Sequence, residues 1–500
     1  MSGMTGDAAQ RPNILLVTVD QWPASLTGYE NHPAILTPTL DQLARNGVRF
    51  PRTYSECPIC IPARRSLMTG TTPRKHGDRS FDPAARMPAL PTLAGTLRGA
   101  GYRSVAVGKL HVYPPRDRIG FDEVFLAEEG RPHLGGPDDY DMFLADQGFA
   151  GQGFLHGMNN NDYLWRPWHL PERTHVTNWT TWQMCREIKR RDPTRPNFWH
   201  LSYTHPHPPL APLQAYLDIY RDAEPPVPPV ADWARDEAAL PYALRSITDY
   251  WAHVKPHHLR GIQRAFYALC THIDHQFRVV LGTLREEGLL DNTVVLFTAD
   301  HGDMLGTHGL WAKRVFYEDS ARVPTILLGP QGDPRTPPGA VDNRLVQLAD
   351  VMPTLLDFAG VAVPEEVEGR SMIGDARREI LTAGCRDDAS ATRMATDGRF
   401  KLIWYPNGNR IQLFDLQEDP QEMQDRAGDA SLAPRRAALE QALVEAAWGV
   451  DGDWISGGRL TGAPARAFRT QANRGLSGQR GNHFPPPPQA GADVVVGTPG

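Results

Sequence analysis

A short cysteine-containing stretch carries the strongest chemical signal in this chain. It reads Cys57-Pro58-Ile59-Cys60-Ile61-Pro62-Ala63-Arg64, and residues 63–68 can form the first turns of a helix. Cys60 is therefore expected near a helix N-terminus, where backbone N–H groups and the helix dipole favour an anion. We predict that Cys60 is the catalytic centre.

Two apolar runs end in an acid. Residues 13–20 and 293–300 are typical of strands buried on both faces of a sheet, and they end in Asp20 and Asp300. Because ligands of open α/β sheets bind outside the carboxyl ends of strands, these acids and their neighbours Gln21 and His301 predict a metal site. Oxygen ligands suit Ca²⁺ or Mg²⁺, and an imidazole shifts the preference toward Mn²⁺ or Zn²⁺. The alternative for any single residue is a capping or loop hydrogen bond.

Basic and imidazole side chains also follow predicted strand ends. Two shorter strands are expected at 104–107 and 197–203. Lys109 and His111 follow the first of them, His207 follows the second, and Lys313 follows Asp300. Each of these residues alone is more often structural or solvated. Their shared placement at strand ends indicates that they surround one site.

The remaining pattern predicts an α/β fold with a large mixed, mostly parallel sheet flanked by helices. Helices are expected at 37–47, 93–99, 257–287, 346–359 and 434–447. Further strands are expected at 48–50, 380–382, 400–404 and 411–414, and one more strand ends at 328. We expect a catalytic domain at 11–390, with an irregular insertion at about 117–193, and a smaller α+β unit at 391–460 containing an antiparallel sheet and a helix. The polar, proline-rich stretch at 461–500 is expected to be an extended tail.

Composition limits the class of protein. The chain has 500 residues, 41% of them hydrophobic and 22% charged, with a net charge of -6. This balance gives no reason to expect nucleic acid or an anionic membrane as a partner. We expect no membrane span, since no apolar run reaches about 18 residues. Five cysteines do not form a disulfide framework, and the N-terminus has no secretory signal pattern, so a cytoplasmic location is expected.

The order of these motifs resembles the sulfatase family of the alkaline phosphatase superfamily, over roughly residues 11–420. Cys60, Pro62 and Arg64 match the family signature Cys-x-Pro-x-Arg, followed by Thr69-Gly70. The resemblance implies an alkaline phosphatase-like fold and metal-dependent hydrolysis of a small-molecule sulfate monoester. It also implies that a separate maturation enzyme oxidises Cys60 to formylglycine, so that an aldehyde hydrate is the nucleophile.

The resemblance implies a role for each candidate residue. One divalent metal would be bound by Asp20, Gln21, Asp300, His301 and the modified Cys60. Arg64 would support the hydrated aldehyde. Lys109, His111, His207 and Lys313 would surround the transferred group, and His207 or Lys313 would protonate the leaving oxygen.

Two departures from the family pattern keep a second reaction open. Many sulfatases have an aspartate and an asparagine where this chain has Gln21 and His301, a combination that looks like the phosphonate monoester hydrolase branch. Lys109 and His111 instead resemble the sulfatase pattern. The alternative substrate is therefore a phosphonate monoester or a phosphodiester.

Two further interpretations of Cys60 have less support. A phosphatase of the same superfamily would have Ser or Thr at position 60, and a zinc or redox pair of Cys57 and Cys60 lacks a second Cys-x-x-Cys. Trp165, Trp168 and Trp179 fit either an aryl pocket or a core. The composition of the tail is compatible with a contact to a neighbouring subunit in a homo-oligomer and with a free end.

Overall fold

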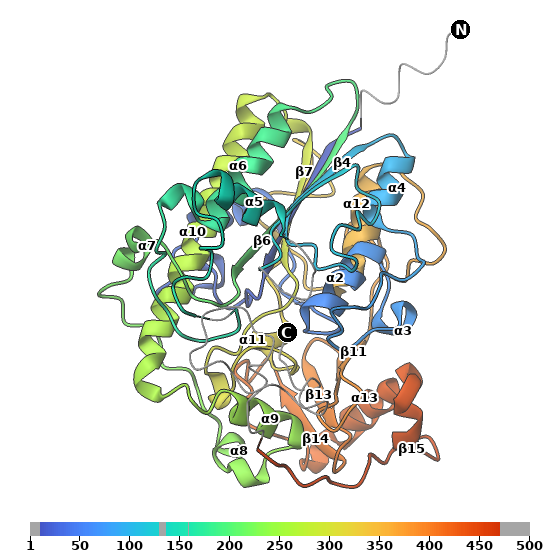
Figure 1. The fold of residues 1–500 in the computed structure, drawn as a ribbon. Helices are drawn as coiled ribbons and strands as arrows, with labels where there is room; N and C mark the ends of the chain where they lie inside the picture. Colours follow the sequence, from blue (N-terminus) through green and yellow to red (C-terminus); the bar gives the residue numbers. More distant parts are fainter. Residues whose placement is uncertain (1–10, 130–136, 159, 471–500) are drawn as a thin grey trace.

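The computed structural model describes residues 11–129, 137–158 and 160–470 (Figure 1). The main sheet has the order β5-β4-β6-β1-β7-β8-β2-β9. Its strands are β1 Asn13–Asp20, β2 Val48–Arg49, β4 Arg103–Gly108, β5 Glu123–Leu126, β6 Asn197–Pro206, β7 Thr293–Ala299, β8 Ile326–Leu328 and β9 Ala340–Val341. The neighbouring strands β5, β4, β6, β1 and β7 are parallel to one another, whereas β8 is antiparallel to β7 and to β2. The predicted mixed, mostly parallel sheet is confirmed.

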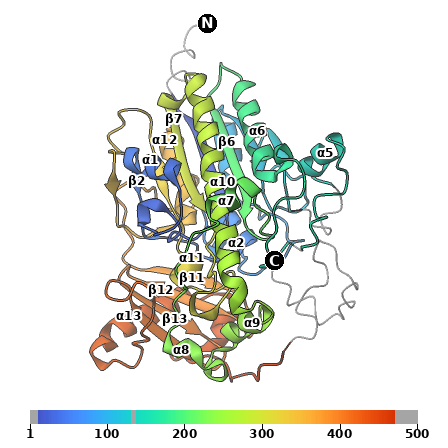
Figure 2. The ribbon, with the colours of Figure 1, turned by 90° about the vertical axis from the view of Figure 1, so that its left-hand side faces the viewer.

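Helices cover both faces of this sheet, which explains why its central strands β1, β6 and β7 are buried throughout. On one face lie α1 Pro38–Asn46, α6 Val176–Lys189 and α10 Leu259–Glu286. On the other lie α2 Cys60–Thr69, α4 Leu93–Gly99 and α12 Val351–Phe358 (Figures 1 and 2). Every residue of β1 is buried between these layers.

The C-terminal unit is a second, antiparallel sheet of order β11-β12-β13-β14. Its strands are β11 Leu381–Cys385, β12 Thr392–Thr396, β13 Phe400–Tyr405 and β14 Arg410–Asp415, and α13 Ala433–Ala446 packs against them. This confirms the predicted small antiparallel sheet with a helix. The sheet begins at Leu381, before the expected boundary at residue 391, and β12 was not predicted.

Shorter elements connect these layers. They are β3 Thr53–Tyr54, β10 Val346–Gln347, β15 Ile455–Ser456, β16 Arg459–Leu460, α3 Pro73–His76, α5 Asp139–Asp146, α7 Gln214–Ile219, α8 Asp232–Arg235, α9 Tyr242–Tyr250 and α11 Glu318–Ala321. None of the helices in the described ranges has the length and apolarity needed to cross a bilayer.

Two segments differ from their predicted structure. The stretch 117–193 was expected to be irregular, but it supplies the edge strand β5 and the helices α5 and α6. The helix expected from residue 346 begins only at Val351, because Val346 and Gln347 pair with Thr53 and Tyr54 as β10 and β3. Part of the predicted tail, 471–500, lies outside the described residues.

Candidate active site

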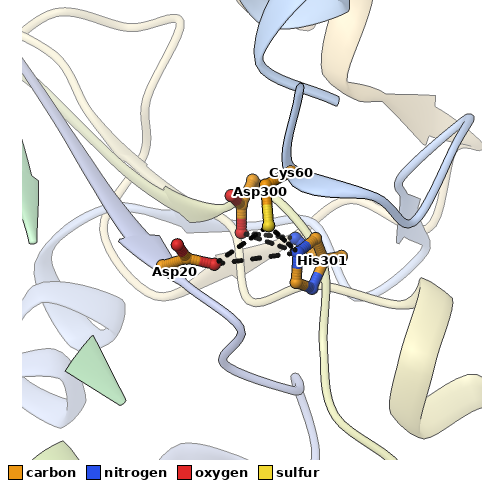
Figure 3. Close-up of side chains that lie close together, drawn as sticks. All are labelled: Asp20, Cys60, Asp300 and His301. Atoms are coloured by element: carbon orange, nitrogen blue, oxygen red, sulfur yellow. Dashed lines mark hydrogen bonds and ion pairs between the residues drawn. The ribbon is translucent and has the colours of Figure 1, made fainter. Parts of the chain in front are cut away.

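Four of the predicted residues converge at the carboxyl edge of the main sheet. Asp20 ends β1, Asp300 and His301 directly follow the neighbouring strand β7, and Cys60 is the first residue of α2. One ligand atom from each lies within 4.8 Å of the others, and all four residues are buried (Figure 3). Adjacent parallel strands bring their carboxyl ends together, so the topology itself creates this cluster.

His301 is oriented toward Cys60 by a hydrogen bond from its ring to the backbone of the next residue. Its Nδ1 lies 3.0 Å from the carbonyl oxygen of Gly302, which can only accept a hydrogen bond, so Nδ1 carries the proton. Nε2 then faces Sγ of Cys60 at 3.2 Å with its lone pair. A carbonyl that fixes the tautomer in this way is typical of metal-ligating histidines. With the oxygens of Asp20 and Asp300, this donor set fits a divalent cation.

Gln21 lies beside the cluster in a left-handed backbone conformation, with φ of 70°. Its backbone N–H donates to Asp300 Oδ1 at 3.1 Å, and its side-chain Nε2 donates to Asp303 Oδ2 at 2.7 Å and to the hydroxyl of Tyr163 at 3.0 Å. Its Oε1 accepts from Lys313 Nζ at 2.6 Å. This oxygen has two lone pairs, so the bond to Lys313 still leaves one for a cation.

Arg64 lies one helical turn after Cys60 and joins three elements. Its Nε donates to Asp300 Oδ2 at 2.9 Å. Its Nη1 donates to the backbone oxygen of Lys109 at 2.7 Å and to Ser202 Oγ at 2.9 Å. Because the side chain is nearly fully buried, these contacts hold the guanidinium in one position under the carboxylates.

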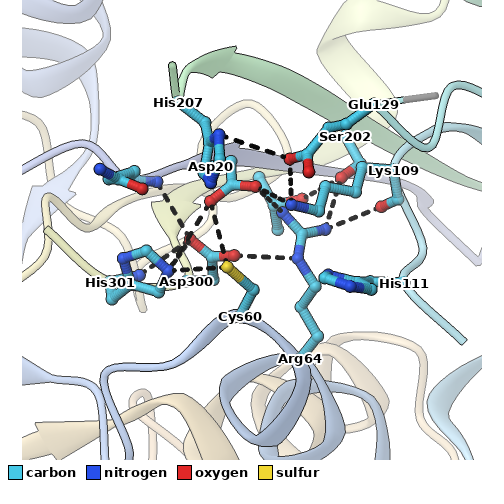
Figure 4. Close-up of polar contacts among 12 residues, drawn as sticks. Asp20, Cys60, Arg64, Lys109, His111, Glu129, Ser202, His207, Asp300 and His301 are labelled. Atoms are coloured by element: carbon cyan, nitrogen blue, oxygen red, sulfur yellow. Dashed lines mark hydrogen bonds and ion pairs between the residues drawn. The ribbon is translucent and has the colours of Figure 1, made fainter. Parts of the chain in front are cut away.

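Lys109 and His207 lie on the side of Asp20 that is opposite Cys60 (Figure 4). Lys109 Nζ forms ion pairs with Asp20 and with Glu129. His207 Nδ1 lies 3.7 Å from Glu129 Oε1, and Nε2 has no hydrogen-bond partner among the described residues. This buried nitrogen is therefore available to a ligand.

His111 follows β4 and is placed by its backbone. Its N–H donates to Glu128 Oε1 at 2.8 Å, and its φ is 59°. Its ring lies edge-on to that of Phe81, with centroids 5.9 Å apart. His111 thus stands at the rim of the same cluster (Figure 4).

The charges of the site favour anions at Asp20 and Cys60. Burial raises the pKa of Asp20, but Lys109, His207 and Arg64 more than offset this and hold it well below its usual value. Burial and Asp20 raise the pKa of the Cys60 thiol, whereas Lys313, Lys109 and His301 lower it, and the net shift is downward. An atom at position 60 therefore carries negative charge more readily than a thiol in water does.

The structure brings all of the predicted residues into one neighbourhood, but several of its residues were not predicted. These are Glu128, Glu129, Tyr163, Ser202 and Asp303. Glu128 and Glu129 come just after β5, so they carry the same strand-end signal as Asp20. That signal was hidden because the composition of the segment did not indicate a strand.

Comparisons with known proteins agree with this architecture. A family model described as Sulfatase matches residues 12–361. An arylsulfatase of Clostridium perfringens (strain 13 / Type A) is 32% identical and covers 90% of this chain and 97% of its own length. A choline-sulfatase of Rhizobium meliloti (strain 1021) is also 32% identical and covers 87% of this chain and 85% of its own.

A solved structure shows the same fold. The phosphonate monoester hydrolase of Agrobacterium radiobacter superposes with a TM-score of 0.75 at 22% identity, over 87% of this chain and 95% of the other. The chain therefore has the fold of this structure. The family model and the arylsulfatase show that the chain belongs to the sulfatase family and is a sulfuric ester hydrolase.

Proposed function

We propose that the protein hydrolyses sulfate monoesters at position 60, after a separate maturation enzyme has oxidised Cys60 to formylglycine. The observation that carries this proposal is the cluster of Cys60, Asp20, Asp300 and His301, whose ligand atoms lie within 4.8 Å of one another. The Cys60-x-Pro62-x-Arg64 signature at the start of α2 supports the modification. The substrate is a small-molecule sulfate ester.

One divalent cation would be bound at this site. Its ligands would be Asp20, Asp300, His301, position 60 and Oε1 of Gln21. We propose Ca²⁺ or Mn²⁺, and Mg²⁺ or Zn²⁺ are the alternatives. The cation supplies stabilisation of negative charge on oxygen. The hydrated aldehyde at position 60 supplies an oxygen nucleophile and a second hydroxyl whose deprotonation releases the sulfate. The buried carboxylate oxygens of Asp20 and Asp300, close to Nε2 of His301, support this assignment.

The protein's own cations would bind and orient the sulfuryl group. Arg64 holds Asp300 and stays beside position 60, while Lys109 and His111 face the sulfuryl oxygens. Lys313 is anchored by Gln21, which supports a role in orientation. His207 is one candidate donor to the leaving oxygen, because its buried Nε2 has no partner among the described residues. Its Nδ1 lies 2.6 Å from the backbone oxygen of Pro208 and carries the proton of the neutral ring, so His207 can donate from Nε2 only as the imidazolium, which burial disfavours by lowering its pKa. Lys313 is the alternative proton donor.

Peptide mass analysis tests the nucleophile. After co-expression with a formylglycine-generating enzyme, the peptide containing position 60 should have lost the mass of the thiol and gained that of an aldehyde, in parallel with aryl sulfatase activity. Cys60→Ala should reduce kcat by at least about 1,000-fold. Full activity of Cys60→Ala would refute the proposal.

Phosphonate monoester or phosphodiester hydrolysis is the second candidate, because Gln21 and His301 occupy the positions that differ from many sulfatases. The ratio of kcat/KM for phenyl sulfate to that for phenyl phenylphosphonate separates the two reactions. A ratio above one supports the sulfatase, and a ratio below one makes the phosphonate the preferred substrate.

We also propose a cytoplasmic location, supported by the five cysteines, all of which are free thiols. We propose that residues 11–390 carry the catalysis and that the C-terminal unit supports them. Fractionation of the source cells, followed by activity measurement, tests the location. Activity in an extracellular fraction would contradict it.

A further inference from the structure

The amide of Gln21 lies in a buried hydrogen-bond network just after β1. Its Nε2 donates one hydrogen to Asp303 Oδ2 at 2.7 Å and the other to the hydroxyl of Tyr163 at 3.0 Å. Its Oε1 accepts from Lys313 Nζ at 2.6 Å. All four side chains are buried. In such a place an amide atom that faces the wrong partner costs more than it does in water.

These partners decide which way the amide faces. A half turn about the Cγ–Cδ bond of a glutamine exchanges its oxygen and its nitrogen with almost no change in shape, so only hydrogen bonds distinguish the two orientations. The ammonium of Lys313 can only donate, and Asp303 Oδ2 faces the other end of the amide as an acceptor. The reversed amide would place oxygen against oxygen at Asp303 and N–H against ammonium at Lys313.

Asp303 is itself fixed in place. Its Oδ1 accepts the backbone N–H groups of Leu305 at 2.8 Å and of Ala312 at 3.1 Å. Its Oδ2 accepts from Gln21 and from the hydroxyl of Tyr163. Four donors thus converge on the two carboxylate oxygens, which matches their acceptor capacity. The carboxylate therefore links the loop that follows β7 to the residue that follows β1.

The hydroxyl of Tyr163 is also held in position. The tyrosine ring packs against those of Trp311 and Trp251, with centroids 4.7 Å and 5.8 Å away. The hydroxyl accepts from Gln21 and donates to Asp303, so the three side chains form a closed triangle of hydrogen bonds. Because each member of this triangle has further contacts, the nitrogen end of the amide has one defined position.

The oxygen end of the amide lies on the side of the proposed cation site. Lys313, which Oε1 anchors, lies close enough to Asp20 and Cys60 for its charge to act on both. The backbone N–H of Gln21 donates to Asp300 Oδ1 at 3.1 Å, which holds this residue against the carboxylates of the site. A reversed amide would turn N–H hydrogens toward the cation and would remove one oxygen ligand.

We propose that Asp303, together with the hydroxyl of Tyr163, is a positioning residue for the cation site. The two groups hold the amide of Gln21 with Oε1 toward Lys313 and the cation, and with Nε2 away from them. Asp303 is not a ligand of the cation and acts on it through Gln21. This inference rests on the proposed function, because the cation and its ligand Gln21 belong to that proposal.

Metal titration of Asp303→Asn tests this role. Asparagine keeps the shape of aspartate but has a donor in place of one oxygen. With its oxygen on the N–H groups of Leu305 and Ala312, its nitrogen faces Gln21, which must then turn its own oxygen away from the cation. Mn²⁺ binding by the matured protein should therefore weaken by about 10- to 100-fold. The EPR signal of free Mn²⁺ measures the Kd independently of activity.

The same substitution in a Gln21→Glu background shows whether Asp303 acts through the amide. A carboxylate has oxygens at both ends, so no rotation of it turns a donor toward the cation. Asp303→Asn should therefore not weaken Mn²⁺ binding in this background. Losses of equal size in both backgrounds would mean that Asp303 acts through its charge or through its loop, and would overturn the inference.

Asp274→Asn is the matched control for a general loss of stability. Asp274 of α10 and Asp303 are each 1% exposed, and Asp274 also accepts two backbone N–H groups, those of Thr39 and Leu40 of α1. Its variant should unfold at lower urea concentration and bind Mn²⁺ as the wild type does. A comparable loss of Mn²⁺ affinity in Asp274→Asn would attribute the effect to stability and contradict the inference.

Tyr163→Phe tests the same arrangement without altering the loop of Asp303. It keeps the ring and removes only the hydroxyl, so Mn²⁺ binding should weaken by about two- to tenfold, the effect of one hydrogen bond. An unchanged affinity would contradict the proposal. If the wild type binds Mn²⁺ and Asp303→Asn binds it equally well, the inference alone fails. If the matured wild type binds no Mn²⁺, the proposed cation site fails and the inference fails with it.

Discussion

Among single residues, Arg64 most directly connects the nucleophile position to the rest of the site. Its guanidinium contacts Asp300, the backbone of Lys109 and Ser202 through a planar fork of donors. Lysine has one flexible ammonium and cannot reach these three groups together. We predict that Arg64→Lys lowers kcat for phenyl sulfate by about 100-fold. Steady-state kinetics on matured protein measures this.

The control for this substitution is Arg74→Lys, since Arg74 is exposed on α3 and outside the cluster. It should keep the activity of the wild type. Arg64→Lys with an activity close to that of the control would show that charge alone, and not the fork of hydrogen bonds, is needed at this position.

At the same scale, the sequence identifies those site residues that have a local signal. Asp20 and Asp300 end apolar runs, and Cys60 lies in a spaced motif, so neighbours along the chain reveal them. Tyr163 contacts Gln21 only through folding of the chain, and Ser202 lies inside a fully buried strand. No local pattern distinguishes such residues from ordinary core or loop positions.

Among the elements, the contact between β4 and β6 sets the position of Lys109. Gly108, the last residue of β4, has φ of 107°, and a Cβ at this position would lie 1.8 Å from the backbone oxygen of Ser202. That oxygen accepts the N–H of Lys109 at 3.0 Å. Gly108→Ala must therefore push the two strands apart at the residues that Arg64 contacts. We predict lower activity and a lower free energy of unfolding.

Gly101→Ala is the matched control for Gly108→Ala. Gly101 has φ of 96°, yet a Cβ there would meet nothing within 4 Å. Both variants carry the cost of a left-handed backbone, so their difference isolates the steric clash. Gly108→Ala should be less stable than the control by at least about 2 kcal/mol in urea unfolding. Equal stabilities would show that β4 shifts without cost.

Long, uniformly apolar strands are the elements that the sequence predicts best, because burial on both faces leaves a clear pattern. The strands β1 and β7 illustrate this, and β5 illustrates the failure, since Glu123 to Leu126 is short and lies in a segment rich in loop-forming residues. The pairing of β10 with β3 also has no local signal, because it depends on a partner almost three hundred residues away.

For the whole molecule, buried ion pairs fasten the C-terminal sheet to the main body. Lys401 on β13 contacts Glu318 of α11 at 2.8 Å and Glu422 at 2.6 Å, and it is completely buried. Arg79 binds Asp451 at 2.8 Å in the same manner. Many elements of both units were predictable from the sequence, but these joints were not, because a lone buried charge has no signature until its partner is known.

Neutral buried histidines give the whole molecule a defined response to acid. Burial lowers the pKa of several of them to about 3 or 4 in the folded state, among them His76, His200, His272 and His308. In the unfolded chain these histidines have their ordinary pKa of about 6.5 and bind protons below that pH. Between these two pKa values the unfolded state holds more protons, so the stability that is present above pH 6.5 is lost as the pH falls.

The contribution of a single histidine can be isolated at His76, whose Nε2 lies 3.1 Å from Ser66 Oγ. Each buried neutral histidine adds up to about 1.4 kcal/mol per pH unit to the slope of the free energy of unfolding between pH 6 and pH 4.5. His76→Gln removes the titrating group, so the slope should decrease by about that amount. Urea unfolding of both proteins at matched pH values measures the difference, in which the titrations of all other groups cancel. An unchanged slope in His76→Gln would show that His76 is protonated in the folded protein as readily as in the unfolded chain.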